Sequence, residues 1–559
     1  MEGKGNNQLA GRTMGKTKAE ELALNQRDIS IAEFFERNRH LLGFDSKRKA
    51  LLTTIKEAVD NSLDACEEAH ILPEIHVEVV DLGNDRFQVI VEDNGPGIVE
   101  AQIPKIFAQL LYGSKFHVLR QQRGQQGIGI SAAALYGQLT TGKPIHIISR
   151  ISEKHDAHYY ELMIDTQTNT PKILKKETIQ WKKGSGTKVI LEIEATYSKN
   201  VDEYLKETAI INPHATLLYK NSRESGLQRF GRVVKELPIA PKEIKPHPHG
   251  IELGMLLKML QLANANSVTQ FLQEEFSRIS PQIARTILKK SNISFSLKPK
   301  AIQRSQAEKL LEVIRETKIM APPSNCLSPI GTDLLERGLK KEVDAEFLTS
   351  AVRPPAVYRG NPFIVEAVLA YGGKLKEDAS TLMRFANRVP LLYQQGGCAI
   401  SKAVLSTNWK SYGLQQPKNG FPEGPIVLAV HFASVWVPFT SEAKEAVAHY
   451  PEIIKEMRLA LQEVGRKLAG YLRKRKKVGD EIKKRAYIEQ YIPHMASAIR
   501  DILELDSKEE ETIKSSLKEI LEKSRKVNIV IEDVTAETEK DVKRERLGLD
   551  LFGEEREDE

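Results

Sequence analysis

Cysteine is scarce in this sequence, and long apolar runs are absent from it. The chain of 559 residues has 3 cysteines, Cys66, Cys326 and Cys398. Because they are odd in number and far apart, they predict neither a disulfide framework nor a paired zinc site, and they indicate a reducing compartment. No apolar run is long enough to span a bilayer, and the polar N-terminus predicts no secretory signal. The sequence therefore argues against disulfide-stapled and membrane-spanning proteins, and we expect a cytoplasmic protein.

What the sequence does contain is enough apolar material for large cores. Hydrophobic residues make up 41% of the chain and charged residues 28%. The length predicts about three or four domains. The formal net charge of +7 is small for a chain of this size, so it permits binding to nucleic acid without demonstrating it. We find no internal repeats.

Changes in composition divide the chain into five parts. A polar arm, 1–27, precedes a region in which helical and strand patterns mix, 28–245. A proline-rich joint leads into a helical block, 246–318, and a second joint leads into another mixed region, 319–480. The last part, 481–559, is expected to be helical at first and then highly charged. These parts predict a multidomain α+β protein.

Periodic patterns place the first elements. Residues 48–70 have apolar side chains at helical spacing. Residues 74–80 and 86–93 alternate like two neighbouring strands joined by a turn. Further strands are expected at 145–149 and 188–192. Together they predict a sheet packed against at least one amphipathic helix.

The patterns also place elements in the second half. Ser280 followed by Pro281 is typical of a helix start. The segment "PIVLAVHFASVWVPF", 425–439, is the clearest strand of the second mixed region. A long helix is expected from about Ser441 to Lys477, where it ends in the basic run "RKRKK".

A glycine-rich segment, "RGQQGIGISAA" at 123–133, directly precedes an apolar, alanine-rich run. Glycine lets a ligand approach the backbone closely, and a helix start presents unpaired N–H groups and partial positive charge. The combination is typical of a phosphate site. The alternative is a flexible turn that only caps a helix.

Two segments of the chain resemble other phosphate-binding motifs. Gly127-x-Gly129-x-x-Ala132 fits a relaxed dinucleotide fingerprint, but the residues before it are too polar for the buried strand that this motif requires. The segment "AGRTMGKT", 10–17, resembles a P-loop but has three residues between its glycines where the motif needs four. We expect neither to function as such.

Polar residues that could serve a nucleotide lie before this segment. Glu57 and Asn61 are four residues apart and share one face of the first helix, where Asp60 and Asp64 widen the polar strip. Simple solvent exposure is the alternative for such a strip. Asp93, in "EDNGPGI", ends a strand and could accept a hydrogen bond from an exocyclic amine such as that of adenine, although Asp-Asn-Gly is also a common turn.

With "GSGT" at 184–187, these segments occur in the order found in the ATP site of the GHKL superfamily, which they resemble. That superfamily includes gyrase B subunits, MutL, heat-shock chaperones and histidine kinases. The wording "LLYGSKFHVLRQQRGQQGIGISAAALYGQ", 110–138, is similar to the archaeal B subunits of type IIB DNA topoisomerases, known as topoisomerase VI. This resemblance extends from about residue 28 to about residue 500. It implies a GHKL (Bergerat) α/β sandwich, a helix-two-turns-helix insert and an α/β transducer domain with a long C-terminal helix.

The resemblance also implies roles for individual residues. Glu57 would be the general base that activates water, and Asn61 would hold Mg²⁺. Asp93 would bind adenine, assisted through water by Thr187, while Ser114 and Lys115 would flank the nucleotide. The lid over the phosphates would consist of Gly124, Gln125, Gln126, Gly127, Ile128, Gly129, Ile130 and Ser131.

Two later segments gain roles in the same way. "FTSEAKEAVAHYPEI" matches the transducer loop of the family, which would place Lys444 on the γ-phosphate as a catalytic switch lysine. Without the family, Lys444 would be taken as a solvated lysine at a helix start. "NWKSYGL" matches a loop implicated in sensing DNA, through Trp409, Lys410 and Tyr412; packing of the two aromatic rings in a core is the alternative.

The implied protein is an ATP-hydrolysing component of a type II topoisomerase, with ATP and Mg²⁺ as cofactors. ATP would drive dimerisation of this chain, and a Spo-eleven-like, tyrosine-bearing A subunit of topoisomerase VI would cut double-stranded DNA in an A2B2 heterotetramer. We expect it at the nucleoid and not at a membrane. Two alternatives stay open: a MutL-like DNA repair clamp, and a non-catalytic clamp or chaperone that ATP only gates.

Overall fold

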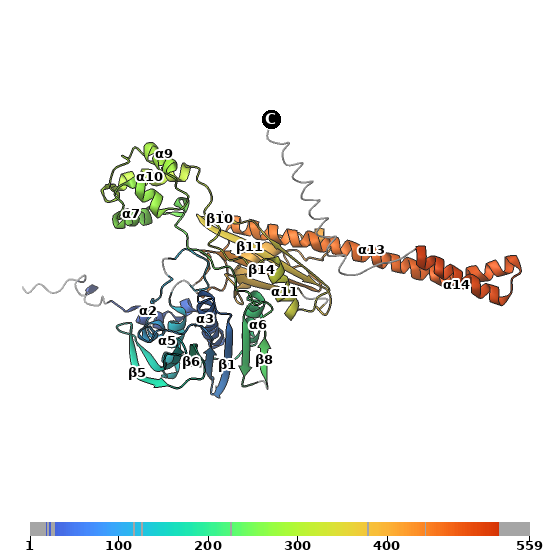
Figure 1. Cartoon of the computed structure of the whole chain (residues 1–559), viewed down its shortest axis with the longest axis horizontal. Helices are drawn as coiled ribbons and strands as arrows, with labels where there is room; N and C mark the ends of the chain where they lie inside the picture. The colour runs from blue at the N-terminus through green and yellow to red at the C-terminus, as the bar shows by residue number, and fades with distance from the viewer. Residues whose placement is uncertain are drawn as a thin grey trace, which may run out of the picture.

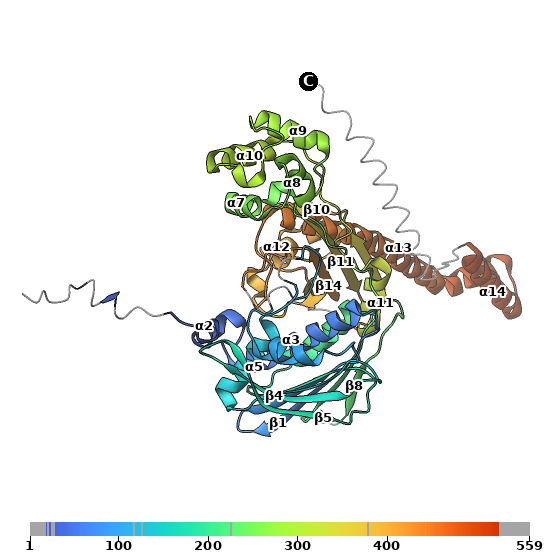
Figure 2. The same cartoon turned by 60° about the vertical axis from the view of Figure 1, so that its left-hand side comes forward.

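The computed structural model describes residues 18, 22–23, 28–115, 118–124, 127–223, 226–376, 380–441 and 443–524. It contains two sheet-based domains, a helical block and a projecting helical hairpin (Figures 1 and 2). Most of the expected arm, 1–27, and the end of the tail, 525–559, lie outside the described residues. None of the helices within the described ranges combines the length and apolarity needed to cross a membrane.

The N-terminal domain has an eight-stranded sheet in the order β5-β4-β3-β6-β2-β1-β7-β8. Neighbouring strands are antiparallel except β1 and β7, which are parallel. Helices α3 and α5 lie across one face (Figure 2). Its elements are α2 (Ile31–Arg37), α3 (Lys47–Glu68), β1 (Glu74–Gly83), β2 (Arg86–Glu92), α4 (Ile103–Ala108), α5 (Gly129–Thr141), β3 (Ile145–Arg150), β4 (Ala157–Asp165), β5 (Thr170–Ile179), β6 (Gly186–Glu194), α6 (Asn200–Ile211), β7 (Thr216–Asn221) and β8 (Leu227–Phe230).

Local sequence accounts for the frame of this domain. The Ser46 hydroxyl accepts a hydrogen bond from the Lys49 N–H and caps α3. Strands β1 and β2 pair where alternation predicted them, and the turn between them uses Asn84 and Asp85, both in the left-handed region. The strands expected at 145–149 and 188–192 are confirmed as β3 and β6.

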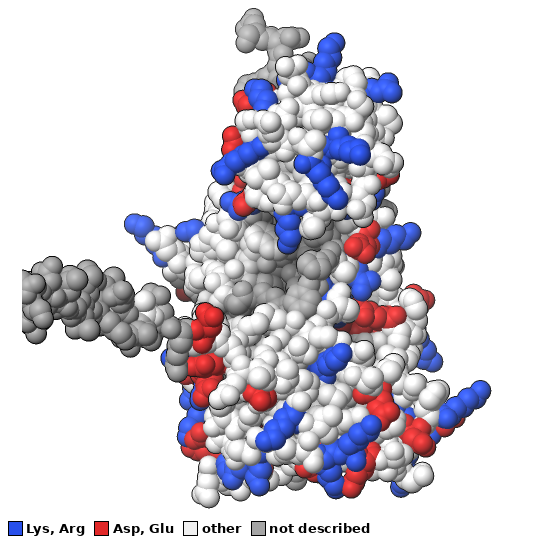
Figure 3. All heavy atoms as spheres, turned by 90° about the vertical axis from the view of Figure 1, so that its left-hand side faces the viewer, with Lys and Arg blue, Asp and Glu red and all other residues white. Residues whose placement is uncertain are grey.

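The helical block is confirmed and has its own apolar core. It consists of α7 (Leu253–Leu262), α8 (Val268–Glu275), α9 (Pro281–Lys290) and α10 (Arg304–Glu316). Ser280 caps α9 by accepting from the Ile283 N–H, and Pro281 occupies the first turn, as the sequence predicted. On the face drawn in Figure 3, this block is at the top and presents several Lys and Arg side chains.

The second sheet has the order β10-β11-β14-β12-β13, and β9 pairs with β11. Its central strands are apolar on both faces, because α12 and α13 cover one face and α11 covers the other. The apolar segment expected as a strand is confirmed as β14. The elements are α11 (Thr332–Glu342), β9 (Phe347–Val352), β10 (Ala356–Tyr358), β11 (Asn361–Tyr371), β12 (Thr381–Ala386), β13 (Val389–Pro390), α12 (Ala399–Ser406) and β14 (Ile426–Ser434).

The long helix, α13 (Pro451–Leu503), differs from the expectation at both ends. It does not begin at Ser441, because Phe439 and Val447 form an antiparallel bridge and Lys444 has a φ of +53°. Pro451 occupies its first turn. The helix continues well beyond Lys477 and through residue 480, where a domain boundary was expected. Helix α14 (Ser507–Ser524) then folds back against it (Figure 1).

Candidate nucleotide-binding site

A cavity of about 580 Å³ lies between α3, the start of α5 and the segment before α5. It brings together most of the residues predicted from sequence. Those that line it are Glu57, Asn61, Asp93, Ser114, Lys115, Gly124, Gly127, Ile128, Gly129, Ile130, Thr187 and Lys444. Gln125 and Gln126 lie outside the described residues. Ser131 was expected in the lid, but it is buried in the first turn of α5, where its hydroxyl donates to the Ile128 carbonyl.

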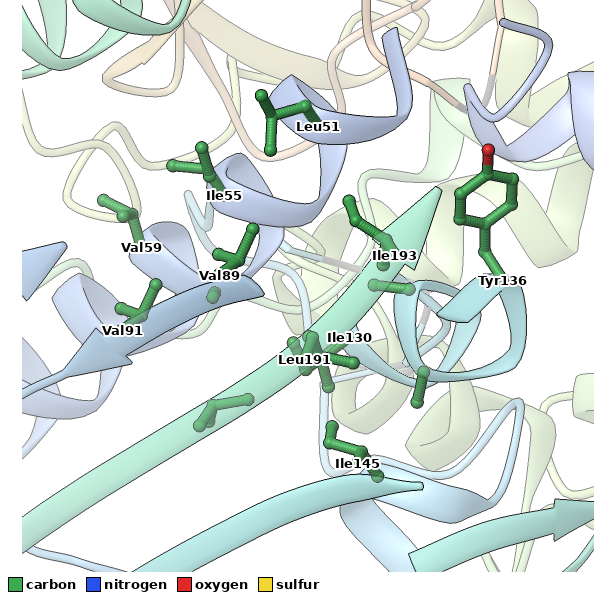
Figure 4. Close-up of a cluster of buried hydrophobic side chains, with 14 of the residues drawn as sticks. Leu51, Ile55, Val59, Val89, Val91, Ile130, Tyr136, Ile145, Leu191 and Ile193 are labelled. Carbon is green, nitrogen blue, oxygen red and sulfur yellow. The ribbon is translucent and has the colours of Figure 1, made fainter. Parts of the chain in front are cut away.

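Helix α3 positions Glu57 and Asn61 because its apolar face is fixed to the sheet. Leu51, Ile55 and Val59 pack in one core with Val89 and Val91 of β2 (Figure 4). Glu57 and Asn61 project from a different side of the helix than these three residues. Glu57 and Asn61 reach the cavity from this side, one helical turn apart.

Gly129 makes room for the Glu57 carboxylate. A Cβ built at Gly129 would lie 1.8 Å from Oε2 of Glu57, so no other residue fits there without displacing that side chain. Gly129 is also the first residue of α5, where unpaired N–H groups favour negative charge. The structure thus places a carboxylate and a helix start side by side at the edge of the cavity.

Asp93 is held in a fixed orientation. Its Oδ1 accepts from the N–H groups of Gly95, at 2.9 Å, and Thr187, at 3.0 Å, and its Oδ2 accepts from the Ser62 hydroxyl at 2.9 Å. Burial raises the pKa of the Asp93 carboxyl, although these three donors oppose the shift. A carboxylate anchored in this way presents its remaining lone pairs to a ligand in one direction.

Part of the wall of the cavity is apolar and suits a flat, uncharged ring. It includes Phe44, Ile98, Ile106, Phe107, Ile130 and Val189. Residues such as Phe44, Ile98 and Phe107 were not predicted, because single apolar residues in a sequence carry no signal that separates a pocket wall from a core.

Asp60 and Asp64 do not form the solvent-exposed strip that was the simpler alternative; both are buried. The Tyr204 hydroxyl donates to Asp60 Oδ1 at 3.2 Å, and burial raises the pKa of the Asp60 carboxyl to about 6. Asp64 instead pairs with Lys115 and with Arg123, each at 2.7 Å. Burial would raise the pKa of Asp64, but these two cations hold it below its usual range. Asp64 therefore holds Lys115 and Arg123 in place and does not face solvent.

Arg123 was part of the glycine-rich segment but received no role from sequence. It is buried, and besides Asp64 its guanidinium contacts Glu67 at 2.6 Å and donates to Asn212 Oδ1 at 2.6 Å. Burial opposes ionisation of Glu67, but Arg123 and then His214 lower the pKa of its carboxyl overall. This network ties the base of the lid to α3 and to the end of α6.

The second domain reaches the cavity through three consecutive residues. The Ala443 carbonyl accepts from the Lys56 ammonium at 3.3 Å, and Glu445 pairs with Lys49 at 2.9 Å. Between them, Lys444 lines the cavity and donates to the Arg123 carbonyl at 3.0 Å. Lys444 is thus not merely a solvated lysine, and residues of two domains line the cavity.

The residues of the expected DNA-sensing loop separate into two environments. Trp409 is buried, and its indole N–H donates to the Val404 carbonyl at 2.9 Å. Tyr412 packs against Gly465 of α13. Lys410 is exposed. A direct contact of the Trp409 ring with DNA would be incompatible with this packing, so the predicted sensing role rests on Lys410.

Comparison with known proteins agrees with this division. The family described as histidine kinase-, DNA gyrase B-, and HSP90-like ATPase matches residues 46–196. The family described as topoisomerase VI B subunit, transducer, matches residues 322–484. The first range holds most of the cavity, and the second holds Lys444.

Curated relatives match most of the chain. A protein of Methanococcoides burtonii, named as the B subunit of type 2 DNA topoisomerase 6, is 53% identical over 495 residues, which cover 87% of this chain and 79% of the relative. A protein of the same name from Archaeoglobus fulgidus is 49% identical over 482 residues, covering 86% and 80%. The chain therefore belongs to the family formed by the B subunits of type 2 DNA topoisomerase 6, and it carries the GHKL ATPase and transducer domains of that family.

Proposed function

We propose that this chain binds ATP in the cavity at α3 and α5 and hydrolyses it. The observation that carries the proposal is the juxtaposition of the Glu57 carboxylate with Gly129 at the start of α5. The glycine-rich segment and the α5 N-terminus supply N–H groups to the phosphates, and Glu57 takes a proton from the attacking water. At the other end of the cavity, Asp93 accepts from the amine of adenine.

Lys444 connects the nucleotide to the transducer domain. In this structure its ammonium donates to the carbonyl of Arg123, at the base of the lid. A γ-phosphate offers a charged acceptor, so binding of ATP favours transfer of this ammonium from the lid to the nucleotide. The segment that carries Lys444 would move with it, which couples the state of the nucleotide to the position of the transducer.

The residues present fit a magnesium ion that is held mainly by the nucleotide. No group of three or more His, Cys, Asp or Glu side chains suited to a metal occurs within the described ranges. The amide oxygen of Asn61, which lines the cavity, is a hard ligand of the kind that Mg²⁺ accepts beside phosphate oxygens and water. Bound there, the ion would offset phosphate charge during transfer.

Membership of the family indicates what ATP binding and hydrolysis would drive. We propose that ATP closes two copies of the chain into a dimer, and that a tyrosine-bearing A subunit cuts duplex DNA so that a second duplex passes through, in an A2B2 assembly at the nucleoid. The basic side chains on the helical block (Figure 3) would contact phosphate backbones without reading sequence. The relatives that match most of the chain favour this function over a MutL-like clamp.

The test compares Glu57→Gln with the wild type in nucleotide binding and hydrolysis. Loss of the base should lower the hydrolysis rate by roughly 10²–10⁴ while nucleotide still binds. The matched control is Glu177→Gln, at an exposed position of β5 outside the cavity lining. Normal hydrolysis by Glu57→Gln would refute its role as the base, and a non-catalytic gate would then be the better account.

Dimerisation and the metal are tested separately. The solution mass of the full chain should double with a non-hydrolysable ATP analogue and Mg²⁺. Asn61→Ala should require more Mg²⁺ for the same response. A mass that stays constant while nucleotide binds would exclude the ATP-closed dimer.

A further inference from the structure

The base of the lid is held to the transducer domain by its own main chain. This base consists of residues 121–123, which directly precede the lid, and each of the three uses one backbone group. The Gln121 N–H donates to the Cys326 carbonyl at 2.9 Å, the Gln122 carbonyl accepts from Asn387 Nδ2 at 2.8 Å, and the Arg123 carbonyl accepts from Lys444 at 3.0 Å.

Of these contacts, that of Asn387 is the least expected. It requires a buried side chain from a hairpin turn of the second sheet, 265 residues further along the chain. The same Nδ2 also donates to the Ser434 carbonyl at 2.9 Å, and Oδ1 accepts from the Ser434 N–H at 2.9 Å. The amide thus spans two segments: the lid on one side and the end of β14 on the other.

The backbone at this turn is unusual and is held in place. Asn387 and Arg388 form the two-residue connection between β12 and β13 and have φ values of +46° and +65°. Such a turn suits Asn at its first position, but Arg at its second position is unfavourable. The Arg388 N–H donates to His431 Nε2 at 2.9 Å, and its guanidinium donates to the Ser328 carbonyl and hydroxyl. Backbone strain of this kind persists only where the surroundings fix it.

A second side chain binds the lid to the same part of the transducer domain. Gln121 accepts from the Ser328 N–H at 2.7 Å and donates to the Ser328 carbonyl at 3.4 Å. Gln121, Ser328 and Asn387 are all buried, so breaking these hydrogen bonds costs free energy when the base of the lid moves. Keeping them favours a joint movement of residues 326–328 and 387–388 with the base of the lid.

We infer that Asn387 is a positioning residue that transmits the position of the lid to the transducer sheet, as a second coupling contact beside Lys444. The inference rests on the proposed function, since the lid is taken to respond to ATP. Lys444 reports on the γ-phosphate directly, whereas Asn387 reports on the lid, because it binds the Gln122 carbonyl and does not line the nucleotide cavity.

The test uses Asn387→Gly in the full-length chain. Glycine adopts the left-handed conformation readily, so the turn is kept while all three side-chain hydrogen bonds are removed. The matched control is Asn419→Gly, at an exposed left-handed position of the same domain. Amide hydrogen exchange is followed with and without a non-hydrolysable ATP analogue and Mg²⁺.

In the wild type and the control, the analogue should slow exchange at 118–124, which includes the base of the lid, and also at 326–331 and 387–391. In Asn387→Gly the segments 118–124 and 326–331, which Gln121 joins directly, should still respond, with analogue affinity within about threefold of the wild type, while the response at 387–391 falls by at least roughly fivefold. A lid that responds also shows that the variant is folded.

Two results would overturn the inference. One is a response at 387–391 in Asn387→Gly equal to that of the wild type, which would make Asn387 a static contact. The other is a wild type in which 118–124 responds and 387–391 never does. If the wild type binds no analogue at all, the proposed function itself fails, and this outcome is distinct from both.

Discussion

The two sheets of this molecule are built on different plans. In β2 of the N-terminal domain, buried and partly exposed residues alternate, because α3 and α5 cover only one face (Figure 2). In β14 of the transducer domain all nine residues are buried. Its second face packs against α11 and also against Ile210 and Ile211, which belong to α6 of the N-terminal domain. The transducer sheet thus shares a core with its neighbour. The buried residues of the N-terminal core all belong to its own domain, and Leu392 and Tyr393 of the transducer are partly buried against them.

The largest effect expected from this difference is on stability. Leu339 of α11 is fully buried in the shared core, so Leu339→Ala should lower the free energy of unfolding by about 2–5 kcal/mol. Ile173 lies on the edge strand β5 and is half exposed, so Ile173→Ala should change it by less than about 0.5 kcal/mol. Urea unfolding followed by circular dichroism measures both. Equal effects would contradict the contrast between the two sheets.

A smaller effect concerns pH, because the pKa of a buried carboxyl is raised in one domain, at Asp60, and lowered in the other, at Glu366. Asp60 keeps its proton up to about pH 6 in the folded state, whereas the unfolded carboxyl loses its proton near pH 4. The free energy of unfolding should therefore fall by roughly 2–3 kcal/mol between pH 4 and pH 6. Asp60→Asn, which still accepts from Tyr204, should make the slope in pH-dependent urea titrations shallower by this amount. A slope unchanged in Asp60→Asn would assign it to other groups.

Glu366 of the transducer domain makes the free energy of unfolding change with pH in the opposite direction. Burial would raise the pKa of its carboxyl, but His431 and the N–H groups of Gly331 and Ile330 lower it overall. Its contribution to stability is therefore present above the unfolded pKa and lost as the pH falls through the folded pKa. Asp60 changes the free energy of unfolding mainly above about pH 4, and Glu366 changes it mainly below that pH. Asp60→Asn should therefore leave the loss of stability below about pH 4 unchanged.

The smallest effect is expected at the surface of the transducer domain. Lys410→Ala should change stability by less than about 0.5 kcal/mol, because the side chain is exposed. If this lysine senses DNA, the variant should lose part of the DNA stimulation of ATP hydrolysis. The slope of the logarithm of its DNA affinity against the logarithm of salt concentration should also fall in magnitude by about one. Lys418→Ala, exposed in the same domain, is the control. Equal stimulation in both variants would remove the last described candidate of this loop.

The sequence predicted those elements whose residue pattern reflects burial within that element alone. The apolar run at β14 and the alternation in β1 and β2 each reflect burial along one strand, and both are confirmed. The start of α13 was misplaced, because the left-handed Lys444 and the Phe439–Val447 bridge depend on contacts with the other domain. The burial of Asp60 and Asp64 was also beyond the sequence, since their partners Tyr204 and Arg123 are far away in the chain.

The site shows the same limit. Motif order placed Glu57, Asn61, Asp93 and the glycines in one cavity, but it gave no sign of Asn387, whose partner is a main-chain carbonyl. A contact to the backbone constrains the conformation of the partner and not its side chain. No motif in the partner segment can therefore reveal it.

The length of α13 sets the scale of any movement that leaves the transducer domain. This helix of 53 residues, which contains Pro493, spans about 80 Å at 1.5 Å per residue. If its first turns tilt by about 5° with the sheet, its far end is displaced by roughly 7 Å, which exceeds the rise of a full helical turn. A shift of the size of one hydrogen bond beside the nucleotide can therefore become, at the α14 end, a displacement large enough to separate or join macromolecular surfaces.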